Sequence, residues 1–270
     1  MTPPALTDAS LDITGRIATV TMQRHDVRNE LTGTALVNDL IAVIDWINAG
    51  LDISVLVLTG GGSAFSSGGN IKHMLAQQGA FAGDIAELQR QYRLGIQRLA
   101  LAMHRLEVPA IAAINGPAIG AGLDLACMCD LRLAASTASM GESFLDVGII
   151  PGDGGAWMLQ RLIGYQAAAE LTFTARIIDA AEAQRLGIVL EVLPPDELLP
   201  RAAALAATIA AKPPQALRLA KRLLKAAPRQ ELSDHLDLAA VFQGICHRTE
   251  DHAEAITAIL AKRPPVFTGR

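Results

Sequence analysis

The sequence predicts an α/β protein in which largely parallel strands alternate with helices, followed by a helical region. Three observations support this fold class. Short apolar runs over residues 54–59, 110–115 and 131–134 have the length and composition of buried strands. Apolar residues recur at helical spacing between these runs. Residues 200–262 contain helical segments only. Strands that alternate with helices are typical of a mainly parallel sheet.

The first elements are a hairpin, a helix and a strand. Over residues 13–22, apolar side chains alternate with threonines, and Thr14-Gly15 marks a turn, so we expect a β-hairpin. From Thr32 to Gly50 the apolar residues fall at helical spacing, and the glycine ends the predicted helix. The run over 54–59 is continuous and β-branched, which predicts a strand buried on both faces.

One long helix and two further strands come next. Residues 84–107 predict a single helix that Pro109 ends. The second buried strand covers 110–115 and stops at the Asn-Gly-Pro sequence that begins at Asn115. The third covers 131–134.

The C-terminal region predicts helices separated by prolines, over 200–211, 215–226, 231–248 and 251–262. We therefore expect an α/β core over residues 1–199 that carries the site, and a helical oligomerisation region over residues 200–270. The Ala-rich apolar faces of these helices need a surface to cover them. The core or a neighbouring subunit can provide it.

Composition excludes several classes of protein. The chain of 270 residues carries a formal net charge of −4, which argues against a protein that binds nucleic acid through bulk positive charge. The apolar stretch over 108–129 is interrupted by Pro109, Asn115, Pro117 and Asp124, so we expect no membrane span. Residues 1–10 lack positive charge and a long apolar run, which favours a cytoplasmic location. Three cysteines without CxxC spacing and six histidines without HxxxH predict no metal site.

Three glycine-containing loops follow the predicted strands, over residues 60–69, 116–122 and 148–155. Ligands of α/β proteins gather at the carboxyl ends of strands. The first loop leads into a short helix over 70–78, and the second into one over 123–128. Unpaired N–H groups at helix starts favour negative charge, so two such starts facing each other would form an oxyanion hole.

Other glycine-based motifs are incomplete. After Gly60-Gly61-Gly62 the third glycine of a dinucleotide-binding fingerprint is missing, because Phe65 stands there, and no acid follows at the required distance. The chain contains no GK[ST] and no GxSxG sequence, which excludes a P-loop and argues against an α/β hydrolase.

Two longer segments resemble a known family. Residues 61–74, GGSAFSSGGNIKHM, are similar to the first signature of the enoyl-CoA hydratase/isomerase (crotonase) family, and residues 113–130, AINGPAIGAGLDLACMCD, are similar to the second. Flanking pieces agree in order along the chain, including GIIPGDGG over residues 148–155. The resemblance therefore covers essentially the whole chain.

This resemblance implies a crotonase-like spiral of ββα units with a C-terminal helical trimerisation region. It implies a homotrimer or hexamer that binds acyl-CoA, with CoA as part of the substrate and no separate cofactor or metal. The backbone N–H groups of Gly69 and Ala121 would hold the thioester oxygen, where negative charge develops in the reaction. Gly68 and Gly122 would adjoin that oxygen, and Arg24 and Lys72 would lie near the nucleotide of CoA.

The acid and base residues depart from the family's pattern. The first of the two glutamates of a typical hydratase aligns with Asp124, and the second aligns with Phe144, which cannot transfer a proton. Asp153 in the third loop offers a replacement carboxylate, so Asp124 and Asp153 are the predicted catalytic pair. Phe144 and Glu142 are predicted to line the substrate site. A structural role as a loop or helix-capping acid is the alternative for each acid.

The resemblance thus implies an enzyme of the enoyl-CoA hydratase/isomerase type that acts on an acyl-CoA thioester through an oxyanion-stabilised enolate, and two alternatives stay open. The Pro-Gly-Asp-Gly sequence around Asp153 resembles that of 6-oxocamphor hydrolase, a family member that cleaves a carbon–carbon bond in a β-diketone without CoA. A non-catalytic CoA-binding protein is a third class. Arg218, Lys221, Arg222 and Lys225 share one helical face, for which exposure to solvent is the simpler expectation and contact with CoA phosphates the alternative.

Overall fold

The main sheet is six-stranded and mostly parallel. The computed structural model describes residues 2–270. The strands lie in the order β1-β2-β3-β4-β6-β9, and only the β1–β2 pair is antiparallel. The strands are β1 (Ala9–Thr14), β2 (Ile17–Met22), β3 (Val55–Gly60), β4 (Ala110–Ile114), β6 (Leu131–Ala135) and β9 (Glu191–Leu193).

The central strands are buried on both faces, as their continuous apolar runs predict. In β3, Val55 and Val57 join the apolar cluster on one face of the sheet, and Leu56 and Leu58 join the larger cluster on the other. This alternation follows from the pleat, because successive side chains point to opposite faces. Helix α9 (Pro195–Ala210) covers the first face with a stripe of small and apolar side chains, Leu198, Ala202 and Ala206.

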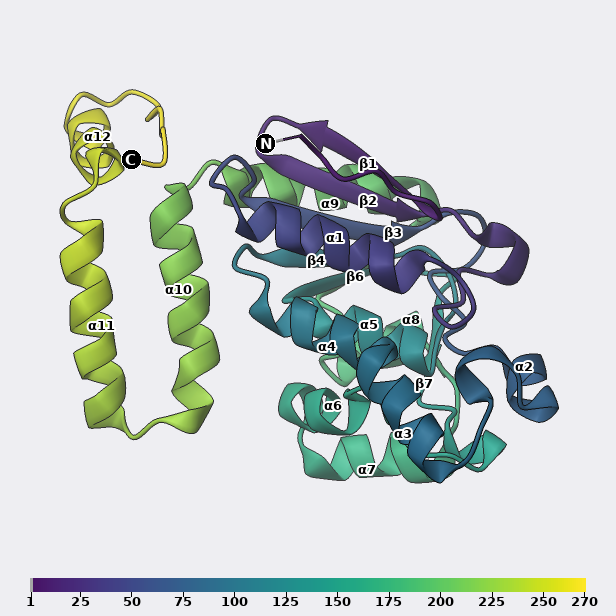
Figure 1. The fold of residues 1–270 in the computed structure, drawn as a ribbon. Helices are drawn as coiled ribbons and strands as arrows, with labels where there is room; N and C mark the ends of the chain where they lie inside the picture. Colours follow the sequence, from purple (N-terminus) through teal and green to yellow (C-terminus); the bar gives the residue numbers. More distant parts are fainter. Residues whose placement is uncertain (1) are drawn as a thin grey trace.

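Three helices cover the opposite face of the sheet and enclose the larger part of the core (Figure 1). They are α1 (Leu36–Asn48), α4 (Ile96–Arg105) and α5 (Ala121–Met128). Helix α5 is buried almost throughout. Its first turn begins directly after the second glycine loop, so the loop's position is fixed by the core.

A small second sheet brings the third loop to the same side. Its strands are β5 (Ala118–Ile119), β7 (Ser139–Gly141) and β8 (Ile178–Asp179), in the order β5-β7-β8. Three short helices follow or flank it, α6 (Gly155–Ile163), α7 (Tyr165–Thr174) and α8 (Ala180–Arg185). Because β5 pairs with β7, the segment after β7 lies beside the start of α5.

The single long helix predicted over 84–107 is wrong. Two helices occupy that range, α3 (Ile85–Leu94) and α4, and they meet at Gly95. A Cβ at this glycine would lie 2.6 Å from the carbonyl oxygen of Gln91, so the break leaves no room for a side chain. The Asp84 carboxylate caps α3 by accepting the N–H of Glu87 at 2.9 Å. The preceding short helix, α2 (Ile71–Ala76), is capped by Asn70 in the same way.

The C-terminal helices are α10 (Pro214–Ala226), α11 (Leu232–Cys246) and α12 (Glu250–Leu260), which stand beside the body (Figure 1). The predicted boundary between residues 199 and 200 falls inside α9. That helix begins with a proline at its first position, where the missing N–H costs no hydrogen bond. It packs on the sheet, so by its contacts it groups with the core.

Two of the four basic side chains on α10 are buried rather than solvated, contrary to the sequence-based expectation. Arg218 and Lys221 are buried. Arg218 pairs with Glu107 at 2.9 Å, and Lys221 pairs with Asp130 at 2.6 Å. These two cations also donate to backbone carbonyls, so they attach α10 to the body.

Among the helices of residues 2–270, none has the length and apolar character needed to cross a membrane.

Candidate active site

Two glycine loops meet at the predicted oxyanion hole. Gly69 ends the loop after β3, and Ala121 is the first residue of α5. Both line one cavity of about 250 Å³. Neither N–H finds an acceptor within the part of the chain that the structure describes, as expected for the first residue of a helix. Two free donors therefore face the same space, which is the arrangement an oxyanion requires.

Glycine is required where these loops touch. Gly68 has φ +78°, and a Cβ there would lie 2.5 Å from the carbonyl oxygen of Ile119 and 2.9 Å from the nitrogen of Ala121. At Gly122 a Cβ would lie 2.1 Å from the carbonyl oxygen of Ser66. The absence of side chains thus lets the two backbones approach closely. Gly68 and Gly122 therefore allow the backbone around the Gly69 and Ala121 N–H groups to pack closely.

Asp153 is the carboxylate of the third loop, and it lines the cavity with Gly69 and Ala121. Its side chain is buried, with 5% of its surface exposed. No donor of residues 2–270 bonds its carboxylate. Burial, and secondarily the charge of Asp124, raise the pKa of Asp153 to about 7. Such a group exchanges protons near neutral pH, which suits a general base.

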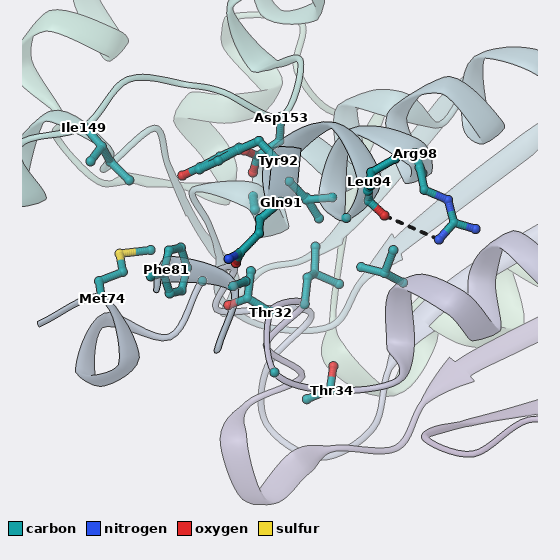
Figure 2. Close-up of a pocket in the computed structure, with 18 of the residues that line it drawn as sticks. Thr32, Thr34, Met74, Phe81, Gln91, Tyr92, Leu94, Arg98, Ile149 and Asp153 are labelled. Atoms are coloured by element: carbon teal, nitrogen blue, oxygen red, sulfur yellow. Dashed lines mark hydrogen bonds between the residues drawn. The ribbon is translucent and has the colours of Figure 1, made fainter. Parts of the chain in front are cut away.

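Tyr92 of α3 lies beside Asp153 at the wall of the cavity (Figure 2). Burial and the negative charge of Asp153 raise the pKa of the Tyr92 hydroxyl. The loop next to Asp153 is held by Gln97, whose Nε2 donates to the carbonyl oxygen of Gly152 at 2.9 Å. Sequence reasoning missed both residues, since Tyr92 of α3 and Gln97 of α4 belong to no recognisable motif.

Asp124 and Glu142 lie behind the cavity rather than in its wall. Their exposed fractions are 0% and 1%, and neither is among the lining residues. Asp124 Oδ2 accepts the N–H of Gly155 at 3.1 Å. Burial and the neighbouring Glu142 raise the pKa of Asp124 well above its usual range. Burial also raises the pKa of Glu142, to about 7.

Phe144 lines the cavity beside Ala121. Its ring atoms would lie 3.6 to 3.9 Å from a Cβ at Gly120, so the ring rests against the turn that precedes α5. This wall of the site is therefore apolar, where a second carboxylate would stand in a typical hydratase according to the alignment of motifs.

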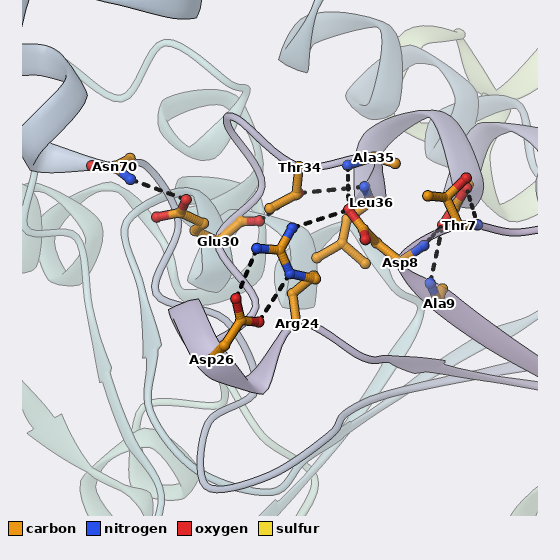
Figure 3. A network of polar contacts seen from close by, with 11 residues as sticks. Thr7, Asp8, Ala9, Arg24, Asp26, Glu30, Thr34, Ala35, Leu36 and Asn70 are labelled. Carbon is orange, nitrogen blue, oxygen red and sulfur yellow. Dashed lines mark hydrogen bonds and ion pairs between the residues drawn. The ribbon is translucent and has the colours of Figure 1, made fainter.

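A second groove, of about 630 Å³, shares Gly69 and Ala121 with this cavity and is called the outer groove below. Lys72 and Arg28 line it, and both are exposed. Arg24 does not line it. Its guanidinium pairs instead with Asp26 at 2.8 Å and with Asp8 at 3.4 Å (Figure 3). Sequence reasoning missed Arg28, four residues beyond Arg24 in the same loop.

The family model for enoyl-CoA hydratase/isomerase matches residues 12–270. The chain belongs to the enoyl-CoA hydratase/isomerase family. The crotonase fold implied by the motifs is confirmed, and the protein is an enzyme of the hydratase/isomerase type.

Named relatives and solved structures agree with this family. The chain is 33% identical over 257 residues to a crotonyl-CoA hydratase of Syntrophomonas wolfei, covering 94% of this chain and 95% of that protein. It is 33% identical over 259 residues to a short-chain-enoyl-CoA hydratase of Clostridium acetobutylicum, covering 96% of each. The crystal structure of an enoyl-CoA hydratase from Bacillus anthracis superposes with a TM-score of 0.91 at 32% identity, over 98% of this chain and 100% of that one.

Proposed function

We propose that this enzyme acts on an acyl-CoA thioester by forming an enolate at the carbon next to the thioester carbonyl. One observation carries the proposal. The free N–H groups of Gly69 and Ala121 and the buried carboxylate of Asp153 line the same cavity. Donors for an oxyanion and a base of suitable pKa are the two parts that enolate formation needs.

The cavity and the outer groove meet at these N–H groups and suit the acyl half and the CoA half of such a substrate. Gly69, Ala121 and Phe144 line both of them. The acyl chain would occupy the cavity, whose walls include Leu31, Val37 and Phe81 in addition. The pantetheine and phosphates would lie in the groove with Arg28 and Lys72, since cations favour phosphate. CoA then enters as part of the substrate, and the proposed steps use no separate cofactor.

Asp153 removes a proton from the α-carbon in the first step, and the electron pair moves onto the thioester oxygen. Two backbone N–H groups stabilise that charge, each donor being worth ~3 kcal/mol in a positioned site. With a double bond between the β- and γ-carbons, the protonated Asp153 returns the same proton to the γ-carbon. The double bond has then shifted into conjugation, and no atom is gained or lost.

Double-bond isomerisation is the reaction this site supports best. Asp153 is the only carboxylate in the cavity wall among the described residues, and Phe144 aligns by motif with the second glutamate of a typical hydratase. A single base can serve both halves of an isomerisation, whereas hydration needs a water positioned and a proton delivered on one face. Hydration is the second candidate, because the relatives at 33% identity are named as hydratases.

A substrate panel tests the proposal. Purified enzyme is given a 3-enoyl-CoA, a 2-enoyl-CoA and a cyclic β-diketone, and the products are followed by mass spectrometry. The expected result is conversion of the 3-enoyl-CoA at a kcat/KM at least tenfold above that for hydration. Turnover of the diketone without turnover of any thioester would contradict the proposal and support the carbon–carbon hydrolase instead.

We further propose that the working enzyme is a homotrimer or hexamer. Helix α11 has no buried residue in the single chain. Large apolar side chains stand exposed along the C-terminal helices, among them Leu224, Leu232, Val241, Ile259 and Leu260. Such a surface on a free monomer is an association site. Light scattering is expected to give three or six times the 28.4 kDa chain mass, and a 28.4 kDa particle at micromolar protein would contradict the proposal.

A further inference from the structure

Three carboxyl side chains meet below the cavity, although they come from three separate segments. Asp124 lies in α5, Glu142 directly follows β7, and Asp153 precedes α6. Each is at least nine-tenths buried. Asp124 and Glu142 are within hydrogen-bonding reach of each other, and Asp153 is close enough for its charge to act on Glu142.

No cation balances this cluster. Among residues 2–270, no Lys, Arg or His forms an ion pair with any of the three carboxyls. The groups around them are Cys127 on α5, which burial keeps a neutral thiol by raising its pKa, and Tyr92 beside Asp153. Arg132 of β6 is turned away, bonded to the carbonyl oxygens of Ile188 and Cys129. Three unpaired negative charges in such an interior would be prohibitively unstable.

The hydrogen-bond donors around Asp124 and Glu142 are too few for two carboxylates. One N–H, that of Gly155, reaches Asp124 Oδ2. Asp124 Oδ1 and both oxygens of Glu142 are buried without any donor in the described chain. A buried carboxylate oxygen without a donor is strongly unfavourable. A proton held between the two carboxyls would supply the missing donor.

We propose that Asp124 and Glu142 share one proton across a hydrogen bond. The pair then carries a single negative charge at neutral pH, and this charge acts on the neighbouring carboxyl of Asp153. Titration then belongs to the pair rather than to either residue. Glu142 is a positioning residue here, since it is screened from the cavity and acts through Asp124 and Asp153. The proposal refines the proposed function, because it states which carboxyl is free to act as base.

Two substitutions of Glu142 have different consequences for the charge beside Asp153. In Glu142→Gln the introduced amide donates to the Asp124 carboxylate, so one negative charge stays beside Asp153. In Glu142→Met the Asp124 carboxyl keeps only the Gly155 N–H as a donor and stays protonated in its apolar surroundings, so the charge is lost. Removal of a negative neighbour lowers the pKa of a carboxyl. The acid limb of the pH–activity profile should therefore shift to lower pH in Glu142→Met and stay in place in Glu142→Gln.

Infrared spectroscopy at pH 9 tests the shared proton without turnover. Exposed carboxyls are fully ionised there, so a protonated-carboxyl C=O band must come from the buried pair. We expect the band in the wild type, in Asp153→Asn and in the control Glu87→Gln, whose exposed glutamate pairs with Arg90. We expect its loss in Asp124→Asn and in Glu142→Gln.

The infrared and pH–activity experiments have distinguishable outcomes. Absence of the band in wild-type protein at pH 9, or its persistence in Asp124→Asn, would overturn the shared proton whatever the enzyme's substrate. If the acid limb of the pH–activity profile lies at the same pH in Glu142→Met and Glu142→Gln, the pair does not influence the pKa of Asp153 as proposed. If Glu142→Met fails to fold, the infrared comparison of wild type with Glu142→Gln still tests whether the proton is shared. Failure of the proposed function would show as no turnover at all, with the band unaffected.

Discussion

The backbone N–H of Gly155 donates to the Oδ2 atom of Asp124 over 3.1 Å, which joins the first turn of α6 to the buried helix α5. The contact is tight on its other side too. A Cβ at residue 155 would lie 2.0 Å from Asp124 Oδ1. One hydrogen bond therefore fixes both the Asp124 carboxyl and the end of the loop that carries Asp153.

Gly155→Ala should destabilise the protein by ~1–3 kcal/mol, the usual range for forcing extra atoms into a packed interior. It should also lower turnover, because the loop that carries Asp153 must move. Urea unfolding and kcat measure the two effects. Gly244→Ala is the matched control, since a Cβ in that helical position of α11 meets nothing within 4 Å. Equal stability of the two variants would contradict the tight contact.

Ala121→Pro should remove one oxyanion donor while keeping the fold. Ala121 is the first residue of α5, a position where proline is well tolerated because its N–H has no helical partner. We expect kcat to fall ~10²- to 10³-fold, as on loss of one donor elsewhere, with little change in the melting temperature. Ala121→Gly retains the N–H and should retain most activity. Undiminished turnover in the proline variant would show that this N–H does not bind the thioester oxygen.

Asp153→Asn should stabilise the folded protein at alkaline pH. The pKa of Asp153 rises from 3.8 to about 7 on folding, so the contribution of this group to stability is largest below pH 4, falls as the pH rises and is lost above pH 7. One pKa unit corresponds to about 1.4 kcal/mol, so the variant should gain up to ~4 kcal/mol at pH 8. Urea unfolding at pH 4 and pH 8 measures this. A gain of equal size at both values would mean that the carboxylate's charge is not the cause.

Arg28→Gln combined with Lys72→Gln should weaken binding of CoA thioesters. Both side chains line the outer groove, where they would meet phosphate groups. We expect KM to rise at least threefold with kcat nearly unchanged. An acyl-pantetheine thioester, which lacks the nucleotide, provides the control and should show no change. If both substrates lose equally, the groove does not recognise the nucleotide.

Local patterns were sufficient to predict the central strands, because the alternation in β3 depends on near neighbours in the chain. The pairing of Gly69 with Ala121 came from the resemblance to the family, since the cavity that they share joins segments distant in sequence. The break at Gly95 was missed, because a single glycine is tolerated in many helices and the apolar pattern continues through it. The close contact that a Cβ at Gly95 would make with the Gln91 carbonyl oxygen exists only in the folded backbone of α3 and α4.

The burial and the ion pairs of the charged residues depend on long-range packing and could not be predicted from the sequence. Burial of Arg218 and Lys221 depends on Glu107 and Asp130, which are distant in sequence. The donor deficit around Glu142 likewise arises only when β7, α5 and α6 come together. Spacing along the chain carries no information on such contacts. The assignments of Asp124, Asp153, Glu142, Arg24 and Lys72 to particular roles remain predictions for experiment.

Exchange of the α-proton of an acyl-CoA in deuterated water tests the central claim most directly, because it needs neither hydration nor isomerisation. A saturated short-chain acyl-CoA is incubated with enzyme, and deuterium at the α-carbon is followed by NMR. The account predicts exchange by the wild type, slowed ~10²- to 10⁴-fold in Asp153→Asn, the usual contribution of a positioned base, and slowed in Ala121→Pro. Exchange at the wild-type rate in Asp153→Asn, or no exchange by a wild type that turns over a thioester, would contradict an Asp153-generated enolate.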